Sequence, residues 1–344
     1  MLLLEVSRRR HLNPQEQCCR NRDCWASGRR GEGHLRIHRL QARRYRCERC
    51  GKTFSATKGT ALYRAHKPPE AVGQVVTLLA HGCPPQAIVA AFGWDERPVA
   101  RYQAEAGAQA RRAHEHLVQA GQVELDQVQA DELRVRLVGG VVWLATALTV
   151  TSRLWLGGVV SAHRDRRLIH ALLARVRACG PTQALLLCVD GLCSYVSQAR
   201  HVFREPVPTG KPGRPRLVLP AGVLLAQAVK RYAKRRVVGV APRVAQGTAA
   251  AVQARLRATQ GKAEAVINTA YVERLNATFR AHLAPLVRRT RAAARQAAPL
   301  AAGRWLVGTC DNCCWPQDSL RRRRGAAVPR AAGGSSARRP RRRG

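Results

Sequence analysis

Residues 166–190, RRLIHALLARVRACGPTQALLLCVD, decide the fold of this chain. Apolar side chains in the first half recur at helical spacing, which predicts an amphipathic helix over 166–179. The run from Ala184 to Val189 is continuously apolar, which is typical of a strand buried on both faces of a sheet. Asp190 follows at the carboxyl end of that strand, where open α/β sheets bind their ligands. The stretch therefore predicts an α/β sheet with an acidic group at its ligand-binding edge.

Three more strands are predicted before this helix. Residues 123–138 alternate apolar and polar side chains, and this segment contains Asp131. Residues 141–150 and 154–160 are shorter strand-like runs joined by short turns, so an antiparallel meander fits their lengths. Three strands, a helix and a fourth strand form a ribonuclease-H-like order. The expected fold class is α/β with a mixed sheet.

A third acidic residue falls on a predicted helix. Apolar residues in 270–286 recur near helical spacing and give the helix a core-facing stripe. Glu273, Asn276 and Arg280 share a different face and offer a carboxylate, an amide and a guanidinium. A Glu on such a face is commonly a surface residue paired with a nearby Arg. Periodicity alone therefore leaves the role of Glu273 open.

The charge of the chain indicates a polyanionic partner. Lys and Arg number 60 against 21 acidic residues, and the formal net charge is +39. Nucleic acid is the simplest partner for such a chain. An anionic membrane surface is the rival, but no long amphipathic basic helix favours it. The longest apolar run, 141–150, is half of the roughly 20 residues that a membrane-spanning helix needs.

Four cysteines in the N-terminal region have the spacing of a metal site. The apolar stretch at the start of the chain is too short for a signal peptide, so a reducing cytoplasm is expected. In that compartment cysteines are expected to bind metal rather than to form disulfides. A Cys-x4-Cys pair precedes a Cys-x2-Cys pair, and Gly51 allows the tight turn that presents two thiolates to one ion. The sequence predicts a zinc knuckle with these ligands: Cys19, Cys24, Cys47 and Cys50.

Other interpretations of the cysteines remain open. One alternative is a metal site of two cysteines and two histidines: Cys19, Cys24, His34 and His38. Its gap between the cysteines and the histidines is shorter than in the usual zinc finger, and it leaves Cys47 and Cys50 unexplained. The four cysteines could also be idle thiols, and the adjacent Cys18 could replace Cys19. Near the C-terminus, a further Cys-x-x-Cys has no partner pair nearby and is expected to be ordinary buried thiols: Cys310 and Cys313, beside Cys314.

Residues 68–118 are predicted to be helical and include a helix-turn-helix. Gly93 supplies the turn between two short helices, and Asp95 is expected to cap the second one. Arg97 and Arg101 then lie one turn apart on its outward face, where they could reach phosphates or base edges. Many small helical pairs look like this and bind nothing, but the basic composition favours DNA binding.

Two basic segments lie between the second and third acidic residues. PGRPR, residues 212–216, resembles a small hook that lays arginine into an A/T-rich minor groove, here through Arg214 and Arg216. The alternative is a solvated basic loop that leads into a strand at 217–219. KRYAKRRVVGV, residues 230–240, is basic with a strand-like end and could follow the DNA backbone.

Several of these motifs together resemble a known family. VQADEL (128–133), VDGLCSY (189–195) and AYVERLNATFRAHLAPLVRRT (270–290) resemble the three catalytic blocks of bacterial insertion-sequence transposases of the DDE superfamily, whose catalytic domain is integrase-like. RYRCERCGKTFSATKGT (44–60), followed by a helix-turn-helix, resembles the N-terminal region of transposases related to insertion sequence one. The resemblance covers roughly residues 13–320. Its third block is the most specific, because acid, amide and basic positions recur there together.

The resemblance implies an activity and a set of site residues. Asp131, Asp190 and Glu273 would be catalytic ligands of Mg²⁺ or Mn²⁺, and DNA-binding or active-site support would come from Asn276, Arg280 and Arg288. The implied enzyme is a metal-dependent transposase that cleaves the element's ends and joins their 3′-hydroxyls to target DNA by two-metal phosphoryl transfer. Its partner is double-stranded DNA, and pairing two ends makes a homo-oligomer the expectation, with no membrane involved.

The expected organisation follows from these assignments. A zinc-binding knuckle spans 1–66, a helix-turn-helix DNA-binding domain 67–120, a ribonuclease-H-like DDE catalytic domain 121–320 and a disordered basic tail 321–344. The expected location is the cytoplasm of a bacterium, in association with the nucleoid.

One segment departs from the family. Relatives commonly carry a Tyr-Asn…Arg-Pro-His block before a Ser-Leu, whereas the matching stretch here is DNCCWPQDSL, residues 311–320. Asn312 and Pro316 survive, as does the Ser-Leu pair, but the Tyr, Arg and His do not. A second function therefore stays open: a catalytically impaired copy that acts as a sequence-specific DNA-binding regulator of the element.

Overall fold

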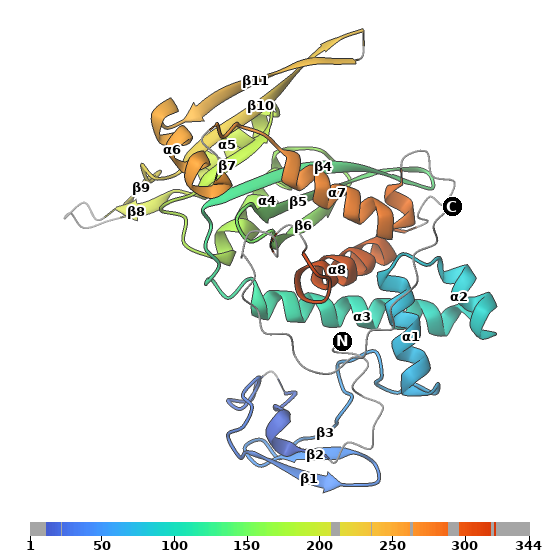
Figure 1. The fold of residues 1–344 in the computed structure, drawn as a ribbon. Helices are drawn as coiled ribbons and strands as arrows, with labels where there is room; N and C mark the ends of the chain where they lie inside the picture. Colours follow the sequence, from blue (N-terminus) through green and yellow to red (C-terminus); the bar gives the residue numbers. More distant parts are fainter. Residues whose placement is uncertain are drawn as a thin grey trace, which may run out of the picture. The chain divides into compact units, whose positions relative to one another are not determined.

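The computed structural model describes residues 12–21, 23–207, 214–234, 236–261, 264–287, 296–317 and 320. Contacts divide the chain into two units, Met1–Cys314 and Trp315–Gly344. Most of the described residues belong to the first unit (Figure 1). Arg288 and the predicted basic tail at 321–344 lie outside the described residues.

The elements of the N-terminal region are short strands followed by helices. A 3-10 turn at Pro14–Glu16 precedes a small antiparallel sheet, in which β2 pairs with both β1 and β3. Three helices come next, and the third has 22 residues. The bounds are β1 Leu35–Arg39, β2 Arg44–Cys47, β3 Thr53–Ser55, α1 Pro69–Ala80, α2 Pro85–Phe92 and α3 Glu96–Leu117.

The larger part of the chain builds a six-stranded mixed sheet with the strand order β11-β10-β7-β4-β5-β6. β4, β5 and β6 form an antiparallel meander, β7 runs parallel to β4 and to β10, and β11 closes an antiparallel hairpin with β10. The strands are β4 Gln127–Leu137, β5 Gly140–Thr149, β6 Trp155–Ser161, β7 Leu186–Asp190, β10 Leu224–Ala233 and β11 Arg236–Gln246. A separate two-stranded sheet pairs β8 (Glu205–Val207) with β9 (Arg216–Val218).

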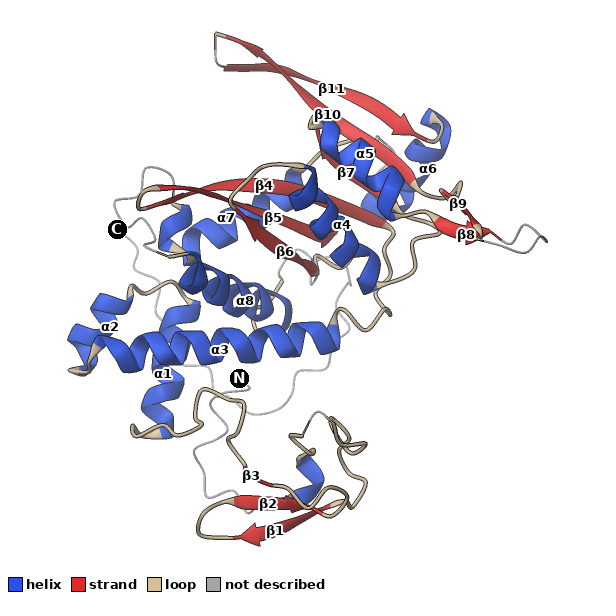
Figure 2. Ribbon diagram, turned by 180° about the vertical axis from the view of Figure 1, so that it is seen from behind, coloured by secondary structure: helices blue, strands red, loops and turns tan. Residues whose placement is uncertain are grey.

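Helices cover both faces of the sheet (Figures 1 and 2). α4 (Arg166–Cys179) and α5 (Cys193–Val202) pack on one face through a core that includes Val128, Ala130 and Leu187. α6 (Ala249–Gln260) packs on the opposite face, against Leu186 and Cys188. α7 (Ala270–His282), which a 3-10 turn at Ala284–Leu286 follows, contacts β4 and β5, and α8 (Ala297–Cys313) contacts β6 and α3. Because alternate residues of a strand point to opposite faces, β7 supplies both cores, with Leu187 and Val189 on one face and Leu186 and Cys188 on the other.

The sequence predicts this mixed α/β class correctly. The predicted helix over 166–179 matches α4, and the three predicted strands correspond to β4, β5 and β6. One expectation about the helix-turn-helix needs correction, because α3 is long rather than short. Its length is explained by α8, which packs along it, so that Leu306 shares a core with Val99 and Tyr102.

The predicted helix cap at Asp95 is also wrong. Asp95 occupies the position before the first turn of α3 in an extended conformation, but its side chain makes no capping hydrogen bond. The turn itself is as expected, since Gly93 adopts a left-handed conformation with φ of 60°. Among the described helices, none combines the length and the apolar character needed to cross a membrane.

Candidate functional site

Asp131 and Asp190 come together through the parallel pairing of β4 and β7. Gln129 is the register partner of Cys188 in that ladder. Asp131 and Asp190 each lie two residues further along their strands, so both carboxylates project on one side of the sheet where β7 ends. The two acids that the sequence places on strands are therefore neighbours.

A third carboxylate, from Glu132, joins this pair. Ligand oxygens of Asp131, Glu132 and Asp190 all lie within 4.8 Å of one another. Arg164 donates to Glu132 Oε2 from Nε (3.0 Å) and from Nη2 (2.7 Å), and Nη2 also approaches Asp190 Oδ2 at 3.3 Å. We call Asp131, Glu132 and Asp190 the acidic cluster. The sequence reading missed Glu132, although its position directly after Asp131 in so basic a chain is a signal.

Glu273 lies just outside the acidic cluster. Its Oε1 accepts hydrogen bonds from Lys230 Nζ on β10 (2.9 Å) and from the Thr269 hydroxyl (3.1 Å). Glu273 is still close enough for its charge to contribute to the raised pKa of Asp131. The structure thus brings two members of the predicted trio together and leaves the third beside them, in an ion pair.

Asn276 links α7 to the acidic cluster. Its side-chain amide donates a 2.7 Å hydrogen bond to Asp131 Oδ2, and the residue is 1% exposed. Arg280, the third member of the predicted helix face, lies one turn further along α7 and is half-buried. Asn276 therefore lies on the side of α7 that faces β4, whereas Glu273 reaches Lys230 of β10.

Gln129 fixes the start of α7. Its Oε1 accepts from the backbone N–H groups of Tyr271 (2.9 Å) and Val272 (3.0 Å), and its Nε2 donates to the Asn268 carbonyl (2.8 Å). The first N–H groups of a helix lack partners within the helix, so this buried side chain satisfies two of them. Because Gln129 and Asp131 lie on the same face of β4, the strand holds the helix that carries Glu273.

Burial and mutual repulsion shape the electrostatics of the acidic cluster. Burial raises the pKa of Asp131 to about 6, and the negative charge of Glu132 adds to the effect, with smaller contributions from Asp190 and Glu273. The pKa of Glu132 is raised by burial, against the lowering effects of Tyr195 and Arg164. Crowded, partly buried carboxylates of this kind are stabilised by a cation.

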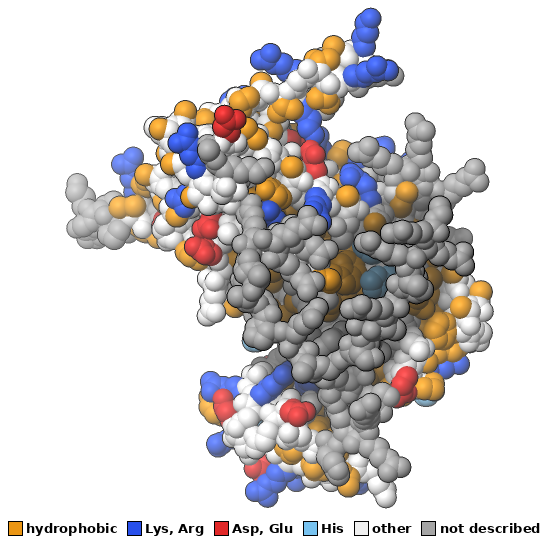
Figure 3. Space-filling model, viewed as in Figure 1, with side chains coloured by type: hydrophobic (Ala, Val, Ile, Leu, Met, Phe, Trp, Pro, Cys, Tyr) orange, Lys and Arg blue, Asp and Glu red, His pale blue; other side chains and the backbone are white. Residues whose placement is uncertain are grey.

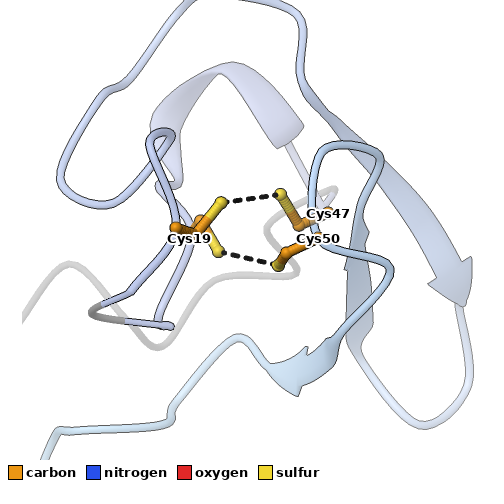
Figure 4. Close-up of side chains that lie close together, drawn as sticks. Cys19, Cys47 and Cys50 are labelled. Atoms are coloured by element: carbon orange, nitrogen blue, oxygen red, sulfur yellow. Dashed lines mark hydrogen bonds between the residues drawn. The ribbon is translucent and has the colours of Figure 1, made fainter.

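The four predicted cysteines form a second possible metal centre. Their Sγ atoms all lie within 4.8 Å of one another, with Cys19 to Cys50 at 3.7 Å and Cys24 to Cys47 at 3.9 Å. All four are free thiols. Cys19 points toward Cys47 and Cys50, which lie at the end of β2 and in the turn after it (Figure 4). Gly51, at φ of 67°, makes the predicted turn, and its N–H donates to the Cys47 carbonyl.

The rival cysteine interpretations receive no support from the described residues. The ligand group contains no histidine, and the two ring nitrogens of buried His34 have no hydrogen-bond partner. Cys18 is buried but lies outside the group, so it does not replace Cys19. The cysteines at the end of α8 belong to no described metal-ligand group, but the expectation that they are buried is wrong, because Cys313 and Cys314 are exposed.

The predicted DNA-contacting arginines lie on the surface. Arg97 and Arg101 are exposed on α3, and Arg101 also donates to the Arg64 carbonyl at 3.1 Å. Arg214 and Arg216 are exposed at the start of β9. Lys and Arg side chains also gather at the outer end of the β10–β11 hairpin (Figure 3).

Comparison with known proteins adds no family to these observations. No protein-family model matches the chain, and no curated protein matches it significantly.

Proposed function

We propose that this chain is a DNA transposase of the DDE type that acts through the acidic cluster together with Glu273. The closeness of the Asp131 and Asp190 carboxylates, just beyond the last pair of the parallel β4–β7 ladder, carries the proposal. Two carboxylates on neighbouring strands, with a third on a helix fastened to the same strand, suit metal-assisted phosphoryl transfer.

The sheet topology supports a ribonuclease-H-like catalytic domain. Along the chain, the antiparallel meander of β4, β5 and β6 is followed by α4 and then by β7. β7 runs parallel to β4 and pairs with the edge of β4 that β5 does not occupy. This is the order of three strands, a helix and a fourth strand that the sequence predicts. In such an arrangement the edge where β7 ends is the expected ligand-binding edge of the sheet.

The residues of the acidic cluster fit a divalent cation. Carboxylate oxygens are the ligands that Mg²⁺ and Mn²⁺ prefer, and the crowding that raises the pKa of Asp131 is relieved by positive charge. Asp131 and Asp190 would hold the ion, with Glu273 beside them. When bound, Mg²⁺ supplies Lewis-acid stabilisation of the phosphodiester oxygens. Asn276 orients the Asp131 carboxylate, and Arg164 neutralises Glu132 and part of the charge on Asp190.

The cysteine group fits zinc. A tetrahedral site with Zn–S bonds near 2.3 Å requires sulfur atoms about 3.8 Å apart. The separations of 3.7 and 3.9 Å agree with that requirement and are far longer than a disulfide bond. We infer a structural zinc knuckle that holds residues 19–50 in place.

Double-stranded DNA is the proposed partner. The net charge of +39 favours a polyphosphate, and the exposed arginines of α3 and β9 offer phosphate contacts. Pairing two element ends in one complex calls for more than one copy of the chain.

A second candidate is a DNA-binding regulator without catalysis. Arg164 pairs with Glu132 and Asp190, and Lys230 pairs with Glu273, so side-chain cations already contact three of the four acids. The altered 311–320 segment points the same way.

Cleavage of DNA carrying the element's ends tests the proposal. The wild-type chain should nick it in Mg²⁺ or Mn²⁺, and Asp190→Ala should abolish nicking while leaving DNA binding unchanged. Asp126→Ala is the matched control, since Asp126 precedes the same strand β4 outside the acidic cluster. Equal cleavage by wild type and Asp190→Ala would refute the site, and binding without cleavage by the wild type would favour the regulator.

A further inference from the structure

Three arginines from three helices surround one tryptophan beyond the edge strand β6. The guanidinium carbons of Arg111 (α3), Arg175 (α4) and Arg304 (α8) lie 5.9, 5.6 and 4.8 Å from the centre of the Trp305 ring. We call these three residues the arginine cluster. Cation–π contacts stabilise each guanidinium modestly, but they do not cancel the repulsion between neighbouring positive charges.

The inner member of the arginine cluster is buried with two of its side-chain nitrogens unsatisfied among the described residues. Arg304 is 5% exposed, and its Nε and Nη1 atoms make no hydrogen bond to any residue that the structure describes. Burial, followed by the charges of Arg175 and Arg111, lowers the pKa of Arg304 to about 9. Unsatisfied donors on a buried guanidinium are costly, so a negatively charged hydrogen-bond acceptor at this position would stabilise the folded state.

A second buried donor without a partner lies nearby. The side-chain amide nitrogen of Gln119, just after α3, has no hydrogen-bond acceptor among the described residues. A Cβ atom at Gly157 of β6 would lie 3.8 Å from that nitrogen and 3.9 Å from Arg175 Cδ, so both groups line the same side of β6. The unsatisfied atoms of Arg304 and Gln119 are donors that require an acceptor, whereas His114 Nδ1 is itself an unsatisfied acceptor, since its Nε2 faces the Leu156 carbonyl.

The surrounding residues supply little negative charge. Glu115 pairs with Arg111 at 2.7 Å and is the acidic side chain that acts on the pKa of Arg175. Among the described residues, no acidic side chain contributes to the pKa of Arg304. Three guanidinium groups therefore face one carboxylate, and that carboxylate sits at the exposed end of the cluster, where the Arg111 side chain is 54% exposed.

We propose that Arg111, Arg175 and Arg304, with the Gln119 amide, form a binding site for a tetrahedral oxyanion, specifically a phosphate group. Guanidinium groups bind phosphate through paired, charge-assisted hydrogen bonds, which suits several arginines converging from different elements. The phosphate can belong to a DNA backbone that reaches Arg111 or to a free inorganic ion. The site lies on α3, α4 and α8, away from the acidic cluster, and does not depend on the proposed catalytic function.

Binding of inorganic phosphate to the full-length chain tests this site. The protein is prepared in chloride buffer, and phosphate is added at constant ionic strength while thermal unfolding is followed. A ligand that binds only the folded state raises the melting temperature with concentration, so phosphate should stabilise the wild type beyond the chloride control. Arg304→Met should remove this phosphate-dependent increase. Arg134→Met, at an exposed position on β4, is the matched control and should retain it.

A second variant covers the case in which Arg304→Met does not fold. Arg111→Met changes an exposed side chain and should weaken phosphate binding by about tenfold, the loss expected when a charge-assisted hydrogen bond is removed. Adding duplex DNA then separates the two sources. Release of bound phosphate by the duplex supports a DNA phosphate, and retention supports a free ion. No phosphate-dependent stabilisation of the wild type, or an equal one in Arg111→Met, overturns the proposal.

Discussion

The side chain of Asn276 on α7 reaches across to β4 and donates a 2.7 Å hydrogen bond to Asp131 Oδ2. The contact joins residues 145 positions apart in the chain, and Asn276 is buried while Asp131 is partly buried. A partner of this kind fixes the orientation of a metal-ligating carboxylate. The helix that carries Glu273 is thereby positioned against the strand that carries Asp131.

Replacing Asn276 by Ala should reduce metal-dependent DNA cleavage about 10- to 100-fold, the range typical of lost support for a metal ligand. The cause is a carboxylate of Asp131 that is no longer held in one orientation. Single-turnover nicking rates measure this effect. Ala277→Ser, an exposed change on the same helix, should leave the rate unaltered, and a normal rate in Asn276→Ala would argue against a positioning role.

Replacing Gln129 by Leu should loosen the start of α7. The N–H groups of Tyr271 and Val272 lose their acceptor, which should destabilise the protein by roughly 1–3 kcal/mol. Hydrogen exchange at Tyr271 and Val272 should accelerate. Gln127→Leu is the matched control, because Gln127 lies two residues earlier on the same face and bonds to Thr259 of α6 instead. If hydrogen exchange at Tyr271 and Val272 accelerated in Gln127→Leu but not in Gln129→Leu, the role of Gln129 at the start of α7 would be contradicted.

Arg164→Met should leave the buried carboxylate of Glu132 without its ion-pair partner. The Glu132 side chain is fully buried and Arg164 is its ion-pair partner, so loss of the guanidinium should destabilise the fold by about 3–5 kcal/mol. Urea unfolding measures the loss. Adding Glu132→Gln to the same chain removes the unpaired carboxylate and should restore much of the lost free energy of unfolding. No recovery in the double variant would mean that Arg164 acts through packing.

Cys47→Ser and Cys50→Ser should each eliminate zinc from the protein. Metal analysis should find about one zinc per chain in the wild type, as in four-cysteine structural sites. Cys18→Ser should retain the metal, since Cys18 lies outside the ligand group. Chelation should expose residues 19–50 to proteolysis, because a structural zinc contributes directly to folding. A metal-free wild type with a protease-resistant N-terminal region would exclude the knuckle.

Buried His114 should make stability depend on pH. Burial, reinforced by the charge of Arg175, lowers the pKa of His114 to about 4, against about 6.5 in the unfolded chain. The unfolded state binds the proton first, so the contribution is full above pH 6.5 and is lost as the pH falls toward 4. Asp131 acts in the opposite direction, since its pKa is raised to about 6 and its stabilising effect declines as the pH rises.

His114→Gln isolates the histidine contribution. Between pH 7 and pH 5 the wild type should lose about 2 kcal/mol more stability than the variant, from the difference between the two pKa values. Urea unfolding at both pH values provides the comparison. Identical pH dependence in the two proteins would show that His114 titrates normally in the folded state.

Sequence reasoning anticipates most of the elements in the catalytic half of the chain. The apolar spacing of 166–179 corresponds residue for residue to α4, and the run after Ala184 becomes the buried strand β7. Such patterns are local, because they record which side of each element is buried. The group of four cysteines is also predictable from the sequence, because two pairs at metal-site spacing supply the four ligands of a tetrahedral zinc.

Local sequence patterns do not reveal contacts between distant segments of the chain. Glu132 was missed because adjacent strand residues point to opposite faces, and only the end of β7 and the position of Arg164 bring its carboxylate next to Asp190. The arginine cluster likewise has no sequence signature, since Arg111, Arg175 and Arg304 lie on three separate helices.

The sequence by itself determined that this protein is a basic α/β chain with a four-cysteine group and two acids on strands that belong to one sheet. The tertiary structure decided which charges meet. It set the register of β4 against β7, placed α7 through Gln129 and Asn276, and paired Glu273 with Lys230. Hydrophobic periodicity is a property of each segment, whereas electrostatic contact depends on distances of a few ångströms between segments, and only the packed chain fixes those distances.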